Sequence, residues 1–409
     1  MTNKRKIFND PVYGFLTIED DLIFDVISHP YFQRQRRIKQ LGFTYLVYPG
    51  AMHTRFSHML GALNLMNRAL EVLKVKGIEL TYDEILGARL AILLHDIGHG
   101  PFSHTSEYML ADMHHEDCSR LFMNRLNEQF GGRLTTAIRI FEGSYPKHFL
   151  HQLVSSQLDM DRLDYLSRDS FFTGVSEGIV GTDRIINMLN VKNDELVVDE
   201  KGIYSVEKFI LSRRLMYWQV YLHKAVVAAD TLLLGILRRA RELAERGVSL
   251  GIEGWPLEDF LTHHYRKEDF ERNPALLDRF AQLDDSEIDT AVKHWMTHPD
   301  FILRTLSEHL INRHLSAIRV SDKPFDAEIV DTFRTQAQLL YNIDLADCGY
   351  FVNTGMLVNH AYDYNDQEIS VLFKDGLCRD IGEASDQLDR RFLEKQVTKH
   401  YIYFPKELR

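Results

Sequence analysis

The sequence has few cysteines, no long apolar run and no excess of positive charge. It contains three cysteines among 409 residues, and no two are spaced as a CxxC pair, so neither a disulfide framework nor a cysteine-rich metal site is expected. The best apolar stretch, residues 225–237, contains Asp230 and is shorter than the roughly 18 residues that a membrane span requires. The first residues lack the apolar segment of a signal peptide. We therefore expect a cytoplasmic protein with no membrane partner.

The formal charge of −11 argues against nucleic acid as the main ligand, because that binding rests on a positive surface. A phosphorylated small ligand is not excluded, since one pocket can be basic on an acidic protein. Apolar residues make up 45% and charged residues 26% of the chain, as in ordinary soluble proteins, and the length suffices for more than one domain.

Hydrophobic periodicity predicts a mainly α-helical fold. Apolar residues between 59 and 73 recur on one helix face, and residues 81–100 have the composition of a buried helix that ends at glycines. Further helices are predicted for 29–42, 115–142, 149–170, 206–246 and, with polar breaks, 256–345. Short hairpins are predicted at 7–18 and 195–205, and a strand or extended loop at 42–51.

The texture changes after residue 346, where alternating and aromatic-rich segments predict strands with a helix between them. The sequence thus predicts three parts. A helical core with short β-hairpins covers 1–250, a helical extension covers 251–345, and a small mixed α+β region covers 346–409. No linker rich in proline, glycine or serine marks the last boundary.

The segment HDIGHGPFSH (95–104) is the sharpest local feature. Its neighbouring His95 and Asp96 offer an imidazole and a carboxylate, which are both ligands for divalent ions, at the end of a buried helix. The segment HTRFSH (53–58) places His58 at the first turn of another helix. A lone His-Asp pair arises easily by chance among 19 histidines. This density of imidazoles is hard to assign to packing, because buried polar groups are costly without partners.

The segment QLDMDRLDYLSRD (157–169) supplies carboxylates on a predicted helix. Its residues Asp161, Tyr165 and Asp169 share one face of that helix. The pattern alone leaves open which of three carboxylates would complete a metal site: Asp159, Asp161 or Asp164.

In these segments the sequence resembles the HD-domain superfamily of metal-dependent phosphohydrolases. More narrowly, it resembles the deoxynucleoside triphosphate (dNTP) triphosphohydrolases, including dGTPase-like enzymes and the antiviral restriction-factor branch. The similarity follows the family's order and extends to about residue 240. The matching segments are DPVYGFLTI (10–18), YFQRQRRIKQLG (31–42), VYPGAMHTRFSHMLG (47–61), LLHDIGHGPFSH (93–104), HE (115–116) and DMDRLDYLSRD (159–169).

The resemblance implies an HD-domain helical core and one divalent metal ion. The residues that match the family's metal ligands are His58, His95, Asp96 and Asp161. Mn, Fe, Zn, Ni and Mg all suit imidazole and carboxylate ligands, so the identity of the metal is open. A second ion near His99 and His115 is also left open.

The resemblance further implies a catalytic group and a nucleotide pocket. The matching phosphate-handling and acid–base residues are His99, His104 and His115, together with Glu116. Arg55 and Arg162 would contact the phosphates, although Arg162 stands where the family has a lysine, whose head differs in shape. The residues predicted to bind the rest of the substrate are Gln40, Leu41, Tyr165, Asp169, Arg213, Tyr217 and Tyr221. Tyr165 matches the ring under the sugar, which in the family excludes a 2′-hydroxyl.

Two departures from the family concern specificity. Tyr217 and Leu222 replace a histidine and a glutamine of the restriction-factor branch, which leaves the base preference open. Ser28 stands where that branch reads guanine with an aspartate, although Gln33 and Arg36 are kept. Activation by guanine nucleotides is therefore open, and a solvated basic helix face explains residues 34–40 equally well.

By resemblance, water would attack the α-phosphorus of a dNTP and release a deoxynucleoside and triphosphate, while His115, steadied by Glu116, protonates the leaving oxygen. One alternative is an HD phosphohydrolase that acts on a nucleoside monophosphate, a cyclic nucleotide or a nucleic-acid end. Another is a non-catalytic nucleotide sensor. A homo-oligomer, dimer or tetramer, is expected, because closed homo-oligomers are common among soluble enzymes.

Overall fold

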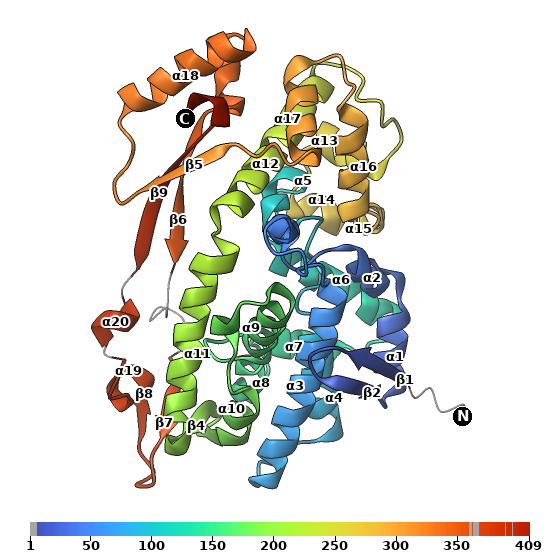
Figure 1. Ribbon diagram of the computed structural model, residues 1–409. Coiled ribbons are helices and arrows are strands. Elements are labelled where there is room, and N and C mark those ends of the chain that lie inside the picture. Colours follow the sequence, from blue (N-terminus) through green and yellow to red (C-terminus); the bar gives the residue numbers. More distant parts are fainter. Residues whose placement is uncertain (1–5, 360–361, 363–367, 389, 395) are drawn as a thin grey trace.

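Helices form most of the molecule, which confirms the predicted mainly α fold (Figure 1). The computed structural model describes residues 6–359, 362, 368–388, 390–394 and 396–409, apart from the side chains of His104 and Phe392. The helices are α1 (Asp21–Ser28), α2 (Pro30–Gln33), α3 (Arg55–Val75), α4 (Tyr82–Leu94), α5 (Glu107–Leu110), α6 (His115–Gln129), α7 (Thr135–Phe141), α8 (His148–Gln152), α9 (Met160–Thr173), α10 (Thr182–Met188), α11 (Ile203–Met216), α12 (Lys224–Glu245), α13 (Pro256–Thr262), α14 (Lys267–Arg272), α15 (Pro274–Phe280), α16 (Asp285–Trp295), α17 (Phe301–Ile311), α18 (Ala327–Tyr341), α19 (Ile381–Ala384) and α20 (Arg390–Glu394).

Within the described residues, the strands form three small sheets. The first is the predicted amino-terminal hairpin, the second has the strand order β3-β4-β7-β8, and the third has the order β5-β9-β6. The strands are β1 (Lys6–Asp10), β2 (Gly14–Ile18), β3 (Leu189–Lys192), β4 (Glu195–Asp199), β5 (Ala317–Ser321), β6 (Asn353–Asn359), β7 (Ser370–Leu372), β8 (Cys378–Asp380) and β9 (Val397–Phe404).

The helices α3, α4 and α9 pack together at the centre of the core. A capping box between Thr81 and Glu84 starts α4, because each side chain accepts a hydrogen bond from the other residue's backbone. Gly61 of α3 lies against α9, where a Cβ atom would come within 2.0 Å of a carboxylate oxygen of the buried Asp164. Glycine therefore allows these two helices to approach.

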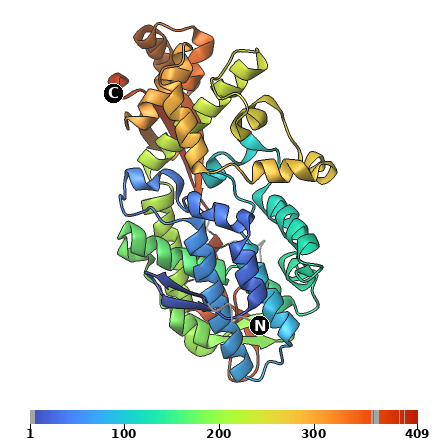
Figure 2. The same ribbon diagram turned by 90° about the vertical axis from the view of Figure 1, so that its right-hand side faces the viewer.

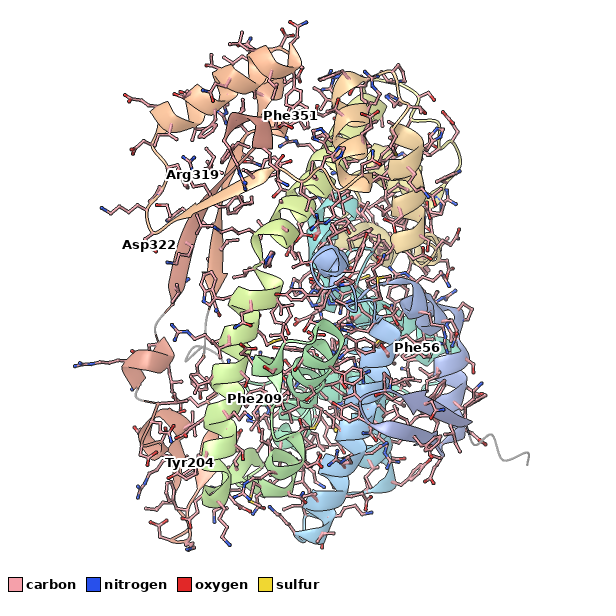
Figure 3. All side chains as sticks on the ribbon, viewed as in Figure 1. Phe56, Tyr204, Phe209, Arg319, Asp322 and Phe351 are labelled. Atoms are coloured by element: carbon pink, nitrogen blue, oxygen red, sulfur yellow. The ribbon has the colours of Figure 1, made fainter. Side chains whose placement is uncertain are left out.

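Two views show how the other elements surround this core. Helices α13–α17 lie at one end of the molecule and the carboxyl end of α3 lies at the other (Figures 1 and 2). The three-stranded sheet and α18 lie outside α12 (Figure 1). In Figure 3, the buried Phe56 and Phe209 lie within the helical body, whereas Asp322 lies beside the outlying sheet with an exposed side chain.

The segment 29–42 is not the single basic helix that the sequence predicts. The helix α2 ends at Gln33, and a 3-10 turn covers Arg34–Arg37. Lys39 then forms an isolated β-bridge with Thr54. This pairing with Thr54, the residue before α3, ends the helix, although local propensity favours its continuation.

The alternative of a solvated basic helix face for residues 34–40 fails where this segment meets the core. Arg34 is fully buried, and its Nε donates to the carbonyl oxygen of Leu283 at 2.7 Å. The segment 42–51 is also not a strand, because Gly42–Leu46 forms another 3-10 turn.

Other predicted helices are present but interrupted. The segment 115–142 gives α6 and α7, which two glycines with positive φ separate, and 149–170 gives α8 and α9. The predicted helix 206–246 contains α11 and α12, separated by a π-helical turn at Tyr217–Tyr221. The second hairpin pairs β3 with β4, so it begins earlier than predicted and its turn lies at Asn193–Asp194.

Strand pairing joins the three predicted parts of the chain. β5 pairs antiparallel with β9, and β4 pairs parallel with β7. The division at residues 250 and 345 stays a prediction. Within the described residues, no single helix is long and apolar enough to cross a membrane, and one pair of helices with a 58° bend meets those criteria only when both are taken together.

Candidate metal centre and active site

Four side chains meet where three helices begin or end. His58 lies in the first turn of α3, His95 and Asp96 follow α4, and Asp161 lies in the first turn of α9. An Asp161 oxygen lies 3.0 Å from Nε2 of His58 and 3.4 Å from Nε2 of His95. Asp96 oxygens lie 3.6 Å and 3.4 Å from the same two nitrogens. Two imidazoles and two carboxylates thus face one point, and this donor set fits a divalent metal ion. We call these four side chains the metal cluster.

The contacts of the three carboxylates near the start of α9 differ. Asp161 faces both histidines. Asp159 caps the helix by accepting the backbone N–H of Arg162 at 2.7 Å, and Asp164 lies 2.7 Å from Nδ1 of His58. Asp161 is therefore the carboxylate that the geometry favours as a ligand.

Both histidines are held so that Nε2 turns toward the cluster. Nδ1 of His95 lies 2.6 Å from the carbonyl oxygen of Ile92. Behind His58, Arg168 donates to Asp164 at 2.9 Å and to Asp10 at 2.7 Å. Such partners on the second ring nitrogen fix the ring orientation and tautomer of a metal-binding histidine.

Burial and neighbouring charges set the ionisation of this cluster. Burial disfavours a charged His58, but hydrogen bonds to Asp161 and Asp164 outweigh it and raise the pKa of His58 to about 10. Burial also opposes ionisation of Asp96, yet His95 and other nearby cations hold the pKa of Asp96 well below its usual range. The same histidines outweigh burial at Asp161 and lower its pKa. Both carboxylates are ionised at neutral pH, which suits a site for a cation.

Two predicted catalytic histidines stack beside the cluster. The rings of His99 and His115 are 3.9 Å apart at 17°, and Nε2 of His99 lies 3.4 Å from an Asp96 oxygen. Burial and the charge of Arg55 lower the pKa of His99 well below its ordinary value. The His99 ring is therefore neutral.

The structure corrects the partner of His115. The sequence predicts that Glu116 steadies this ring, but the Glu116 side chain is 63% exposed and lies 3.9 Å from His114. Instead, Nδ1 of His115 lies 2.8 Å from a Glu107 oxygen, which also accepts the backbone N–H of His115 at 2.5 Å. The His104 side chain lies outside the described residues.

The two predicted phosphate-binding arginines have different partners. Arg55 donates from Nε to the Ser103 hydroxyl at 2.9 Å and also donates to Asp96. Arg162 lies 3.3 Å from the side-chain oxygen of Gln157, and Arg213 donates to the same oxygen at 3.2 Å. Gln157 thus joins α9 to α11 through two cations.

Aromatic residues and a buried carboxylate extend the site along α9. Tyr221 donates its hydroxyl to Asp169 at 2.8 Å, and burial together with that carboxylate raises the pKa of Tyr221 well above its ordinary value. Its ring meets Tyr165 edge-on at 6.3 Å and Tyr217 at 5.1 Å. The other Asp169 oxygen lies 2.7 Å from Nε2 of His53.

Gln40 and Leu41 lie beside the segment that enters α3. The backbone N–H of Gln40 donates to the carbonyl oxygen of His53 at 3.0 Å. Its side-chain oxygen is buried and has no hydrogen-bond partner within the described part of the chain. Leu41 packs against the hydrophobic core. Through His53, Gln40 is therefore linked to Asp169 and Tyr221.

The HD domain family matches residues 55–169, and the HD associated region matches residues 180–246. The uncharacterised protein YwfO of Bacillus subtilis is 33% identical over 99% of this chain and 93% of its own length. A crystal structure of a phosphohydrolase from Bacteroides thetaiotaomicron has 48% identity and a TM-score of 0.94, and the match covers 98% of this chain and 100% of that one. The chain belongs to the HD-domain superfamily of phosphohydrolases.

A more distant relative carries a more specific name. The deoxynucleoside triphosphate triphosphohydrolase SAMHD1 homolog of Dictyostelium discoideum is 33% identical over 54% of this HD-domain chain and 46% of its own length.

The HD-domain motif contains a glycine that the packing requires. A Cβ atom on Gly98 would lie 2.2 Å from the carbonyl oxygen of His115 and 2.3 Å from the backbone nitrogen of Ser119. Gly98 therefore allows the first turn of α6, which carries His115, to lie against the metal-binding loop.

Sequence reasoning gave no supporting role to four residues of this HD-domain site, although it considered one of them, Asp164, as a possible metal ligand. Each holds a predicted site residue: Asp164, Glu107, His53 and Gln157. Asp164 follows Asp161 by three residues and His53 opens the HTRFSH segment, so local spacing offered a signal for both. Glu107 and Gln157 act across turns, where helical spacing gives no signal.

Of the three residues considered for guanine-nucleotide activation, Gln33 and Arg36 contact each other. Gln33 donates to the carbonyl oxygen of Ile27 at 2.7 Å, and Arg36 donates to Gln33 at 2.9 Å. Ser28 ends α1. These contacts are internal and leave the prediction about guanine nucleotides untested.

A second group of ligand types lies near the metal cluster. Atoms of Glu107, His114 and His115 lie within 4.8 Å of one another. The backbone N–H and the Nδ1 atom of His115 already lie within hydrogen-bond distance of one Glu107 oxygen. Hydrogen bonding therefore accounts for this closeness without an ion.

Proposed function

We propose that this protein is a metal-dependent hydrolase that cleaves deoxynucleoside triphosphates at the α-phosphorus, giving a deoxynucleoside and triphosphate. The continuity of α9 carries the proposal, because one helix bears Asp161 at the metal cluster and also Tyr165 and Asp169 farther along. The name of the relative from Dictyostelium discoideum supports this substrate class.

The chain's own residues would divide the work. A divalent ion, when bound by His58, His95, Asp96 and Asp161, would supply a polarised phosphoryl oxygen and a water of lowered pKa. Arg55 and Arg162 would neutralise charge on the phosphate oxygens.

His115 would donate a proton to the leaving oxygen as the general acid. Glu107 would hold that ring through Nδ1, leaving Nε2 to face the substrate. The neutral His99 would support the ring by stacking against it.

The sugar and base would lie along α9 and the π-helical turn. The ring of Tyr165 would lie under the sugar and exclude a 2′-hydroxyl. Asp169 would be fixed by His53 and Tyr221, and the unpaired Gln40 oxygen would accept a hydrogen bond from the nucleotide. Leu41, Arg213 and Tyr217 would complete the pocket.

The test supplies each of the four dNTPs with Mn²⁺, Mg²⁺, Fe²⁺, Zn²⁺ or Ni²⁺ and separates the products by anion exchange. Release of intact triphosphate supports the proposal. Stepwise loss of orthophosphate, or turnover of only monophosphates or cyclic nucleotides, would replace it with the alternative phosphohydrolase. Binding without turnover in any metal would point to a sensor. We also propose a homodimer or homotetramer, which light scattering would measure.

A further inference from the structure

One buried carboxylate joins two loops that flank the metal cluster. Asp285 is the first residue of α16 and is 2% exposed. One oxygen accepts the backbone N–H of Phe102 at 2.8 Å. The other accepts the backbone N–H of Lys39 at 2.9 Å and lies 3.3 Å from the Lys39 ammonium. Asp285 lies outside both regions that the family comparisons match.

The loop at Phe102 needs a partner to keep its shape. Phe102 and Ser103 have φ angles of 52° and 48°, a left-handed conformation that is unfavourable for residues other than glycine. The Ser103 hydroxyl accepts a hydrogen bond from Arg55, which also donates to the ligand Asp96. The position of this turn therefore determines where the Arg55 guanidinium lies.

The segment at Lys39 also positions Arg55, because it pairs with the residues directly before that arginine. Lys39 pairs with Thr54, and the next residue, Gln40, donates to the carbonyl oxygen of His53. This pairing fixes the segment that enters α3 at Arg55.

Two arginines also hold the segment before Lys39 against the start of α16. Arg37 pairs with Asp284, and Arg34 donates to the carbonyl oxygen of Leu283 at 2.7 Å. Arg34 and Gln35 also donate to the carbonyl oxygen of Ile97 in the metal-binding loop, at 3.4 Å and 3.0 Å. Asp285 differs from them because it binds the backbone of the left-handed turn at Phe102.

We propose that Asp285 is a positioning residue of the active site, which ties the left-handed turn at Phe102–Ser103 to the segment Lys39–Gln40 and so holds Arg55 beside the metal cluster. Its loss would leave the buried backbone N–H of Phe102 and the partly buried backbone N–H of Lys39 without their acceptor. The kinetic part of this inference rests on the proposed function, whereas the structural link between the loops does not.

The test compares Asp285→Ala, Asp285→Asn and Asp289→Asn in the full-length, metal-loaded protein. Asp289 is the matched control, because it lies one turn farther along α16, is 40% exposed and lies 3.5 Å from the Lys39 ammonium. Asp285→Ala should lower kcat per bound metal roughly 10- to 100-fold. The kcat of Asp285→Asn should lie between those of wild type and Asp285→Ala, since its amide oxygen can still accept a hydrogen bond from Phe102. Asp289→Asn should stay close to wild type.

Hydrogen exchange gives a readout that needs no turnover. The amides of Phe102 and Lys39 should exchange faster in Asp285→Ala than in wild type or Asp289→Asn. In a Ser103→Ala background, Asp285→Ala should cost less activity than it does alone, because both act through Arg55.

The outcomes separate the two claims. A wild type that hydrolyses no dNTP would end the proposed function, and amide exchange would then decide the positioning role alone. An active wild type with unchanged kcat per bound metal and unchanged exchange in Asp285→Ala would overturn the positioning role. Activity that falls only in proportion to lost metal or lost folded protein would overturn it too.

Discussion

The metal cluster and the nucleotide wall share α9 but are held in different ways. The nucleotide wall is our name for the proposed nucleotide-binding residues Tyr165, Asp169, Tyr217 and Tyr221. His58 at the metal end is fully buried and is backed by the ion pairs of Arg168. At the wall, the three tyrosine rings are half-buried and touch edge-on. Paired charges in a buried setting make the metal end rigid. In the wall, His53 and Tyr221 hold Asp169, whereas the rings of Tyr165 and Tyr217 are held by packing and can adjust to a ligand.

Removing two of the proposed ligands should abolish metal binding. The double change His95→Ala/Asp96→Ala takes away half of the donor set, so metal content should fall to background and turnover below detection. Mass spectrometry of bound metal and a dNTP assay measure both. The exposed His264 gives a control, His264→Ala, which should change neither, and activity retained in the double variant would refute the ligand assignment.

Weakening the support of His58 should have a smaller effect at the same end. Asp164→Asn keeps the shape but removes the charge that Nδ1 of His58 faces at 2.7 Å. Metal affinity should fall roughly 10- to 100-fold, as measured by competition with a chelator. The exposed pair of Arg68 and Asp183 supplies the control Asp183→Asn, and equal affinities in both variants would mean that Asp164 serves packing alone.

A change at the wall should leave the metal end intact. Tyr221→Phe removes the hydrogen bond to Asp169 but keeps the ring, so it should cost about 1 kcal/mol of binding. That cost appears as a KM for dNTP raised about fivefold, with metal affinity unchanged. If metal affinity falls as well, the two regions are not separable in the way their contacts indicate.

The smallest effect is expected from thiol labelling, which tests the rigidity of the core behind His115. Cys118 of α6 is fully buried, and burial raises the pKa of its thiol to about 12. Cys348 is buried too, whereas Cys378 is exposed. Ellman's reagent at pH 8 should therefore label Cys378 alone in the native protein and all three thiols after unfolding, with activity kept. Rapid labelling of native Cys118 would show that this side of the site opens.

The sequence could predict the metal end because its signal is local. His95 and Asp96 are adjacent, and His58 lies at the start of a strongly periodic helix. Asp161 needed the family resemblance, since Asp159 and Asp164 offer the same chemistry, and the contacts with the two histidines now favour it.

The remaining features depend on contacts that are distant in sequence. Asp285 meets Phe102 across 183 residues, and no local pattern in α16 indicates that contact. The π-helical turn at Tyr217–Tyr221 interrupts a segment whose apolar pattern favours one continuous helix. The partner of His115 is Glu107 and not the expected Glu116, because a turn, rather than helical spacing, brings Glu107 close to the His115 ring.

The most direct test of the account follows isotope during a single turnover. A dNTP is hydrolysed in water enriched in ¹⁸O with the metal-loaded protein, and both products are analysed by mass spectrometry. Attack of water on the α-phosphorus predicts one ¹⁸O atom in intact triphosphate and none in the deoxynucleoside. Label in the deoxynucleoside, or label in orthophosphate or pyrophosphate instead of triphosphate, would contradict the account.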